Sequence, residues 1–166
     1  MSLPDNRIAV CPGSYDPVTH GHLDVISRAS AMFDKVIVAV VNVPMRKGGT
    51  LFSTEERVGF LENATREFPN VSVEPFSTLV VELAHQRGAK AIVKGLRAIS
   101  DFEYEFEMNQ LNRRQAPDVE SVYLMASPKY SFLRSSGVKE LATFGGYIDE
   151  LVPDEVAVAL KERLSR

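Results

Sequence analysis

The chain has 166 residues, of which 45% are hydrophobic and 25% charged, and these values predict one soluble globular domain with a core of its own. Nineteen basic residues against twenty-two acidic ones give a formal charge of -3, which argues against a general nucleic-acid-binding protein because such proteins are usually basic. The single cysteine, Cys11, excludes an intrachain disulfide and a zinc site built from cysteines, and its apolar neighbours predict a buried thiol.

The hydropathy of the chain predicts a cytoplasmic protein. No stretch reaches the ~20 consecutive apolar residues that a membrane span needs. The first seven residues, Met-Ser-Leu-Pro-Asp-Asn-Arg, contain no apolar signal core. We therefore expect a cytoplasmic protein that binds neither a membrane nor nucleic acid.

Short runs of β-branched and other apolar residues predict five strands, at 8–11, 36–41, 71–73, 91–93 and 121–125. The second run is apolar throughout, as in a strand that is covered on both faces. Amphipathic segments lie between the runs. This alternation predicts an α/β fold: a doubly wound, five-stranded parallel sheet with right-handed crossovers, in a single domain spanning residues 1–166.

Apolar spacing and capping residues predict the helices between these strands. The tetrapeptides 53–56 and 100–103 both match the capping box Ser-x-x-Glu, which closes a helix N-terminus. The second of them is expected to open a helix that runs to about Arg114. The other expected helices are 23–33, 79–87 with its end at Gly88, one capped by Ser135 or Ser136 that ends at Gly145-Gly146, and one that begins at Pro153.

Ligands of open parallel sheets bind beyond the carboxyl ends of the strands, so we expect the site after residues 11, 41, 93 and 125. The loop 12–22 follows the first strand. In it, Gly13 lets backbone amides approach an anion, Ser14 adds a hydroxyl group, and Gly21 leaves the helix start unobstructed. Free amides and about half a positive charge at a helix N-terminus favour phosphate, and His22 would point its ring at the same place.

Two other interpretations of this loop remain open. His22 lies near the apolar line of the following helix, so it could simply cap that helix and pack in the core. His20 and His22 could also bind a metal, although no third ligand lies nearby. The loop matches neither Gly-x-Gly-x-x-Gly nor the P-loop with its lysine, so neither common phosphate-binding loop applies.

Charged and hydroxyl side chains follow the fourth and fifth strands. Lys94 and Arg97 flank Gly95, and two cations at a strand end make an anion site as good an interpretation as solvated loop charges. The acidic run 101–107 could be an exposed helix start that complements the helix dipole. Serines at 131, 135 and 136 are either helix caps or phosphate ligands.

The first loop carries a family resemblance. Pro-Gly-Ser-Tyr-Asp-Pro at 12–17, followed by Thr19-x-Gly21-His22, resembles the signature of the nucleotidylyltransferase superfamily with the (His/Thr)-x-Gly-His motif. The resemblance implies a Rossmann-like fold. It also implies that His22 is the second motif histidine, which binds an ATP phosphate and stabilises the transition state.

Two further segments indicate the branch of this superfamily. Lys-Gly-Leu-Arg-x-x-x-Asp-Phe-Glu-Tyr-Glu at 94–105 and the segment 130–140, with Tyr-Ser-Phe and Val-Lys-Glu, resemble bacterial phosphopantetheine adenylyltransferases. The similarity extends from residue 8 to about residue 164. It implies transfer of AMP from ATP to 4′-phosphopantetheine, giving dephospho-coenzyme A and pyrophosphate by in-line attack of the substrate phosphate, without a covalent intermediate.

The same resemblance implies a set of site residues and partners. Catalysis would involve His22 with Lys94 and either Arg46 or Lys47. Mg²⁺ would accompany ATP and be bound mainly through it. The resemblance also implies a homohexamer, with coenzyme A as a feedback ligand. Phosphopantetheine would contact Ser14, Arg46, Lys47, Val80 and Lys94, and ATP would contact Ser14, Tyr15, His22, Gly95, Leu96, Arg97, Glu105, Tyr130, Ser131, Phe132, Leu133, Arg134, Ser135 and Ser136.

The chain departs from the family pattern in two places. The turn after the second strand is about two residues longer than the family's Pro-Ser-Lys or Pro-Ala-Lys turn. Counting from Pro44 favours Arg46 as the phosphate-binding residue, whereas chemical identity favours Lys47. Arg134 stands where a serine is common, so a backbone amide would have to replace the hydroxyl contact.

Two other functions compete with this one. Another adenylyl- or cytidylyltransferase would share the first loop, but cytidylyltransferases tend to carry Ser-Thr-Thr in the last motif. Nicotinate mononucleotide adenylyltransferases lack the Asp-Phe-Glu-Tyr-Glu segment. A non-catalytic nucleotide-binding or sensor domain would bind ATP without turnover, and the presence of candidate segments at all four strand ends argues against it.

Overall fold

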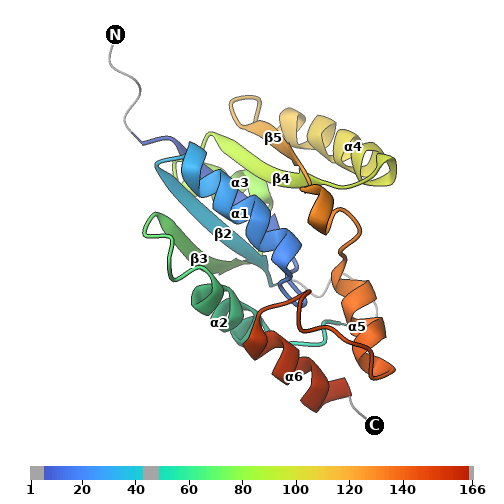
Figure 1. Ribbon diagram of the computed structural model, residues 1–166. Helices are drawn as coiled ribbons and strands as arrows, with labels where there is room; N and C mark the ends of the chain where they lie inside the picture. The colour runs from blue at the N-terminus through green and yellow to red at the C-terminus, as the bar shows by residue number, and fades with distance from the viewer. Residues whose placement is uncertain (1–5, 43–48, 165–166) are drawn as a thin grey trace.

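A computed structural model describes residues 6–42 and 49–164 (Figure 1). Its centre is a five-stranded parallel sheet with strand order β3-β2-β1-β4-β5. The strands are β1 (Ile8–Gly13), β2 (Lys35–Val41), β3 (Val71–Phe76), β4 (Ala91–Leu96) and β5 (Glu120–Met125). The predicted α/β fold with a five-stranded parallel sheet is confirmed.

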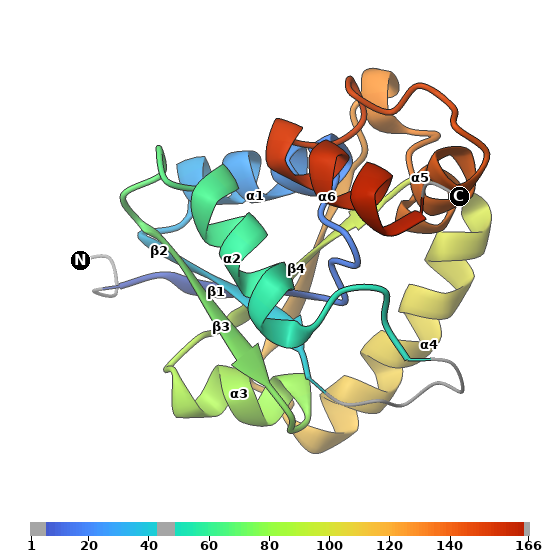
Figure 2. The same ribbon diagram turned by 90° about the horizontal axis from the view of Figure 1, so that it is seen from below.

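Helices cover both faces of the sheet, as the view in Figure 2 shows. One face carries α1 (His20–Met32), α2 (Thr54–Ala64) and α6 (Asp154–Leu164), with α5 (Ser135–Thr143) packed beside α6. The other face carries α3 (Val80–Gln86) and α4 (Ile99–Gln115). A short 3-10 turn, η1 (Pro128–Tyr130), connects β5 to α5.

Alternating side chains of the strands build one core on each face. Val36, Val38 and Val40 of β2 point into the cluster under α1, α2, α5 and α6. Ile37 and Ala39 of the same strand point into the cluster under α3. This two-sided burial explains why β2 is apolar throughout.

Cys11 lies in the larger cluster and is buried, as its neighbours predicted. Burial raises the pKa of its thiol to about 12. The thiol is therefore protonated near neutral pH and packs as a small apolar group.

The two predicted capping boxes have different outcomes. Ser53 caps α2 as expected: the Glu56 amide donates to its Oγ at 3.2 Å, and Glu56 Oε2 accepts from the Ser53 amide at 2.8 Å. The prediction for Ser100 is wrong, because α4 begins at Ile99 with Ala98 as its N-cap. The Asp101 carboxylate instead accepts the backbone amide of Arg97 just before the helix.

The predicted start of α5 is also wrong by one residue. Its N-cap is Arg134, without a side-chain cap, rather than Ser135 or Ser136. Ser135 Oγ donates to the Pro17 carbonyl at 2.8 Å and so connects α5 to the loop after β1. This contact across the fold replaces the expected local cap.

None of the helices formed by residues 6–42 and 49–164 combines the length and apolar character that a membrane crossing requires.

Candidate active site

Three of the four predicted segments meet at the carboxyl edge of the sheet. Arg97 Nη1, at the end of β4, donates to the Leu133 carbonyl at 2.9 Å. Leu133 belongs to the segment 130–136, and the hydrogen bond from Ser135 to Pro17 joins this segment to the loop after β1. A Cβ added to Gly21 would lie 3.6 Å from Tyr130 Cβ, so the start of α1 also touches this segment. The fourth segment, with Arg46 and Lys47, lies outside the described residues.

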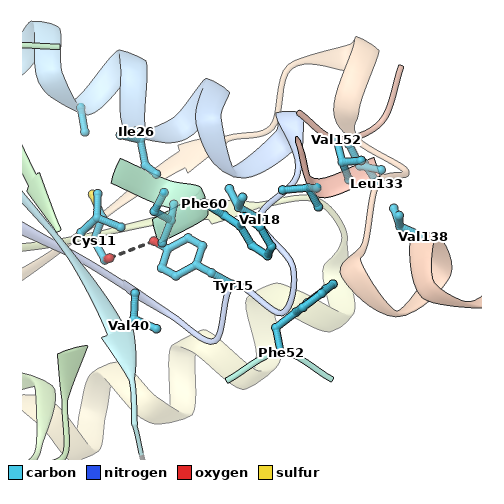
Figure 3. Close-up of a cluster of buried hydrophobic side chains, with 14 of the residues drawn as sticks. Cys11, Tyr15, Val18, Ile26, Val40, Phe52, Phe60, Leu133, Val138 and Val152 are labelled. Atoms are coloured by element: carbon cyan, nitrogen blue, oxygen red, sulfur yellow. Dashed lines mark hydrogen bonds between the residues drawn. The ribbon is translucent and has the colours of Figure 1, made fainter. Parts of the chain in front are cut away.

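Tyr15 is a core side chain. Its hydroxyl donates to the Cys11 carbonyl at 2.8 Å, and its ring lies among apolar side chains of the larger cluster (Figure 3). A Cβ at Gly13 would come within 2.9 Å of this ring, so the glycine makes room for Tyr15. The ring is therefore engaged inside the protein, which leaves the backbone of Tyr15 for the ATP contact that the resemblance implies.

His22 caps its own helix. The Thr19 backbone amide donates to His22 Nδ1 at 3.0 Å, and the His22 amide donates to Thr19 Oγ1 at 3.4 Å, which is a capping box with histidine in the third helical position. The Tyr15 ring meets the imidazole edge-on, with the ring centroids 5.0 Å apart. The structural interpretation of His22 as a helix cap is thus correct, and it fixes how the ring is held.

The cap also fixes the protonation of the ring. Nδ1 accepts a backbone N–H, so it carries no proton, and the neutral ring must carry its proton on Nε2. Burial, with a smaller contribution from the positive charge of Arg97, lowers the pKa of His22 to about 4. At neutral pH the imidazole is therefore uncharged and offers one N–H donor from Nε2.

This shifted pKa makes stability depend on pH. The ordinary value is 6.5, so between about pH 6.5 and 4 the unfolded chain binds a proton at His22 that the folded chain does not. The free energy of unfolding should therefore fall as the pH is lowered through this window. We expect His22→Asn, whose Oδ1 can still accept the Thr19 amide, to lose less stability over the same range. Urea unfolding at pH 7, 6 and 5 measures this, and parallel pH profiles for the two proteins would contradict it.

The amides at the start of α1 are less free than the sequence predicts. The His20 amide donates to the Leu151 carbonyl at 3.0 Å, and the His22 amide is the one held by Thr19. Two of the first three helix amides thus already have partners. A phosphate here would rely more on side chains and less on the helix start than expected.

Both cations at the end of β4 are paired with acids from α4. Lys94 Nζ lies 2.9 Å from each oxygen of Glu105, and Arg97 Nε lies 3.0 Å from Asp101. All four side chains are partly buried. The cations are therefore neither loose loop charges nor fully available, and an anion would have to share or replace these carboxylates.

Gly95 lies between the two cations and against α1. A Cβ there would come within 2.9 Å of Val25 Cγ2. The absence of a side chain thus lets the end of β4 approach the helix closely.

The remaining predicted residues lie around the same edge. Leu133 is buried and Phe132 is exposed, while the Tyr130 ring lies 6.3 Å from His20. Arg134 and Ser136 are exposed at the start of α5, and Ser131 Oγ donates to the Pro128 carbonyl. Leu96 is partly buried, Ser14 is exposed, and Val80 is the first residue of α3.

Sequence reasoning missed two buried charges beside this edge, Asp16 and Arg57. The Asp16 carboxylate accepts the amides of Leu51 and Phe52 at 2.9 Å and pairs with Lys139 of α5 at 3.0 Å. Arg57 could have been noticed, because it lies four residues before Leu61 and so on the buried face of its helix.

Similarity to known structures agrees with the fold. A Vibrio parahaemolyticus protein whose structure was described as that of a nicotinate-nucleotide adenylyltransferase superposes with a TM-score of 0.70, covering 93% of this chain and 91% of that one. The two sequences are only 16% identical, so the likeness concerns the fold alone.

Sequence comparisons identify the family. The Cytidylyltransferase-like family matches residues 10–141. A phosphopantetheine adenylyltransferase from Caldanaerobacter subterraneus subsp. tengcongensis is 51% identical over 160 residues, which cover 96% of this chain and 99% of that protein. Its counterpart from Clostridium tetani is 50% identical over 150 residues, covering 90% and 92%. This chain therefore belongs to the cytidylyltransferase-like family and, within it, to the phosphopantetheine adenylyltransferases.

Proposed function

We propose that this chain transfers the AMP group of ATP to 4′-phosphopantetheine, giving dephospho-coenzyme A and pyrophosphate. The observation that carries the proposal is identity of about half, over nearly the whole chain, to proteins named for this activity. A second observation supports the proposal. Three segments meet at the edge of the sheet where ligands bind, namely 12–22, 94–97 and 130–136.

The proposed reaction needs no general base. A phosphate monoester is already an anion near pH 7, so it can attack the α-phosphorus of ATP directly as pyrophosphate leaves on the opposite side. The protein's task is then to position the two substrates and stabilise the charge that develops. We assign the main stabilising contact to His22, whose Nε2–H would donate to a phosphate oxygen.

Lys94 and Arg97 would supply positive charge beside His22, together with Arg46 or Lys47. The Lys94 ammonium is paired with the Glu105 carboxylate. Substrate phosphate would take over this ammonium, and the freed Glu105 carboxylate could then accept hydrogen bonds from the nucleotide. The segment 130–136 would close the nucleotide side of the site.

The described residues do not form a metal site of their own. Within 6–42 and 49–164, no three His, Cys, Asp or Glu side chains gather to hold an ion. The buried carboxylate of the first loop, Asp16, already accepts two amides and pairs with Lys139. We therefore propose that Mg²⁺ arrives as part of the ATP complex, bound by the phosphates.

A pyrophosphate-release assay tests the function. ATP and CTP are each paired with 4′-phosphopantetheine, nicotinate mononucleotide and glycerol 3-phosphate. Release is expected only with ATP and 4′-phosphopantetheine. Release only with another pair would show a different transferase, and ATP binding without release for any acceptor would support a sensor domain.

We also propose that the chain forms a homo-oligomer, a hexamer by analogy with the family. Helix α4, all of whose seventeen residues are described, has none buried, and Ile99, Phe102 and Phe106 are exposed along it. An exposed apolar patch of this kind is typical of a subunit interface. Light scattering should give a mass about six times the 18.4 kDa of one chain.

Coenzyme A, which shares the pantetheine arm of the product, is the proposed feedback ligand.

A further inference from the structure

Arg57 is a buried cation in the first turn of α2, with only 3% of its surface exposed. Its Nη1 donates to the carbonyl of Ser14 at 2.7 Å and to the carbonyl of Val41 at 3.0 Å. Its Nε donates to the Phe52 carbonyl at 3.2 Å, and its Nη2 donates to Thr54 Oγ1 at 3.1 Å. One guanidinium therefore connects three separate segments of the chain.

These contacts join the ends of two neighbouring strands. Ser14 directly follows β1, Val41 is the last residue of β2, and the two strands pair in parallel. Thr54 Oγ1 also donates to Asn42 Oδ1, which immediately follows β2. Arg57 thus holds the first loop of the candidate site at a fixed place relative to the end of the next strand.

Stability alone does not account for an arginine here. Burying a cation costs free energy, and a well-packed apolar side chain of similar volume often stabilises a core as well or better. What a guanidinium adds is direction, because its planar fork can hold several oxygens at set angles. The number of oxygens it holds indicates that the geometry of these strand ends is what the residue maintains.

We propose that Arg57 is a positioning residue for the transfer reaction, which sets the Ser14 loop against the end of β2 and thereby aligns the acceptor phosphate for attack. This inference rests on the proposed function. Ser14 is a proposed contact of both substrates, and the position of the other nucleotide contacts makes the acceptor the substrate that we expect to be affected. Most of the other proposed nucleotide contacts, 95–97 and 130–136, belong to β4 and to the segment that follows β5, and these two strands lie on the side of β1 away from β2.

The test compares Arg57→Lys with Arg163→Lys. A lysine at 57 keeps the charge but has a single nitrogen, whereas the arginine contacts Ser14 and Val41 through Nη1 and Thr54 through Nη2. Arg163 is a matched control, because it also donates to this region, at the Leu51 carbonyl and Glu56, but contacts neither strand end. Both are assayed below their unfolding temperatures for acceptor kcat/KM, and the Kd for ATP alone is measured by calorimetry.

For Arg57→Lys we expect kcat/KM for 4′-phosphopantetheine to fall about 10- to 100-fold, the scale of a small misplacement of reacting groups, while the Kd for ATP changes less than about threefold. Arg163→Lys should resemble the wild type in both measurements. Unchanged kcat/KM in Arg57→Lys, equal losses in both variants, or a parallel loss of ATP affinity would overturn the inference.

Two measures keep the test decisive. If Arg57→Lys does not fold, Thr54→Val takes its place, since it removes one acceptor of the guanidinium and the bond to Asn42. It should lower acceptor kcat/KM about threefold with ATP affinity preserved, and an unchanged kcat/KM would again overturn the inference. The wild type is assayed first, so that a failure of the proposed function shows as absent wild-type turnover and is distinct from a failure of the role of Arg57.

Discussion

Replacing His22 with alanine is expected to lower turnover about 100-fold or more in a chain that still folds, the scale for losing one donor to a transition state. The physical reason is the orientation of the ring. Thr19 holds Nδ1, so Nε2 presents its N–H in a fixed direction, and alanine offers no donor there. Steady-state pyrophosphate release with purified protein measures the effect.

His22→Asn separates the two roles of this residue. Asparagine can accept the Thr19 amide as Nδ1 does, but it cannot place a donor at the position of Nε2. We expect it to keep more stability than alanine and to lose nearly as much turnover. Wild-type turnover in His22→Ala would show that the catalytic role is wrong. Wild-type turnover in His22→Asn alone would show that only the helix cap matters.

Asp16→Ala should reduce the free energy of unfolding by about 3 kcal/mol, because it removes a buried carboxylate and leaves interior donors without an acceptor. The lost contacts are those from the amides of Leu51 and Phe52 and from Lys139, which is itself partly exposed. Urea unfolding at pH 7 measures the change.

Asp34→Ala is the matched control for this prediction. Asp34 also accepts a backbone amide and pairs with an arginine, Arg7, but both side chains are exposed. Exposed pairs contribute little to stability, so the loss should be much smaller. Equal losses in the two variants would mean that burial of Asp16 does not matter.

The sequence predicted the fold well because its strongest signals are local and periodic. Apolar runs located all five strands, although their ends shifted by a few residues. Strand β3 was expected at 71–73 but runs from Val71 to Phe76, through Pro75. A proline is tolerated there because β3 lies at the edge of the sheet, where an amide needs no partner strand.

The candidate site was harder to predict where distant contacts override local patterns. Ser135 looks like a helix cap, yet its hydroxyl reaches Pro17 across the fold. Gly13 looks like an opening for an anion, but the space beside it holds the Tyr15 ring. Arg57 looks like one charge among several at a helix start. In each case the deciding partner lies on another element, which no local pattern reveals.

The lack of buried residues in helix α4 affects Lys94 and Arg97, the two cations that its acids hold. Elements that bury few side chains open locally at a lower free energy than the whole protein unfolds, and amide hydrogen exchange reports such openings. The acids that hold Lys94 and Arg97 belong to a helix with no buried residue among its seventeen, all of them described. In a single chain, α4 should therefore exchange faster than α1, whose Ile26 and Ala29 are buried. Its openings would separate both cations from their carboxylates at once, while Arg97 keeps its bond to the Leu133 carbonyl. A subunit packed on the outer face of α4 would slow these openings. It would thereby control how long Lys94 and Arg97 stay paired with their carboxylates.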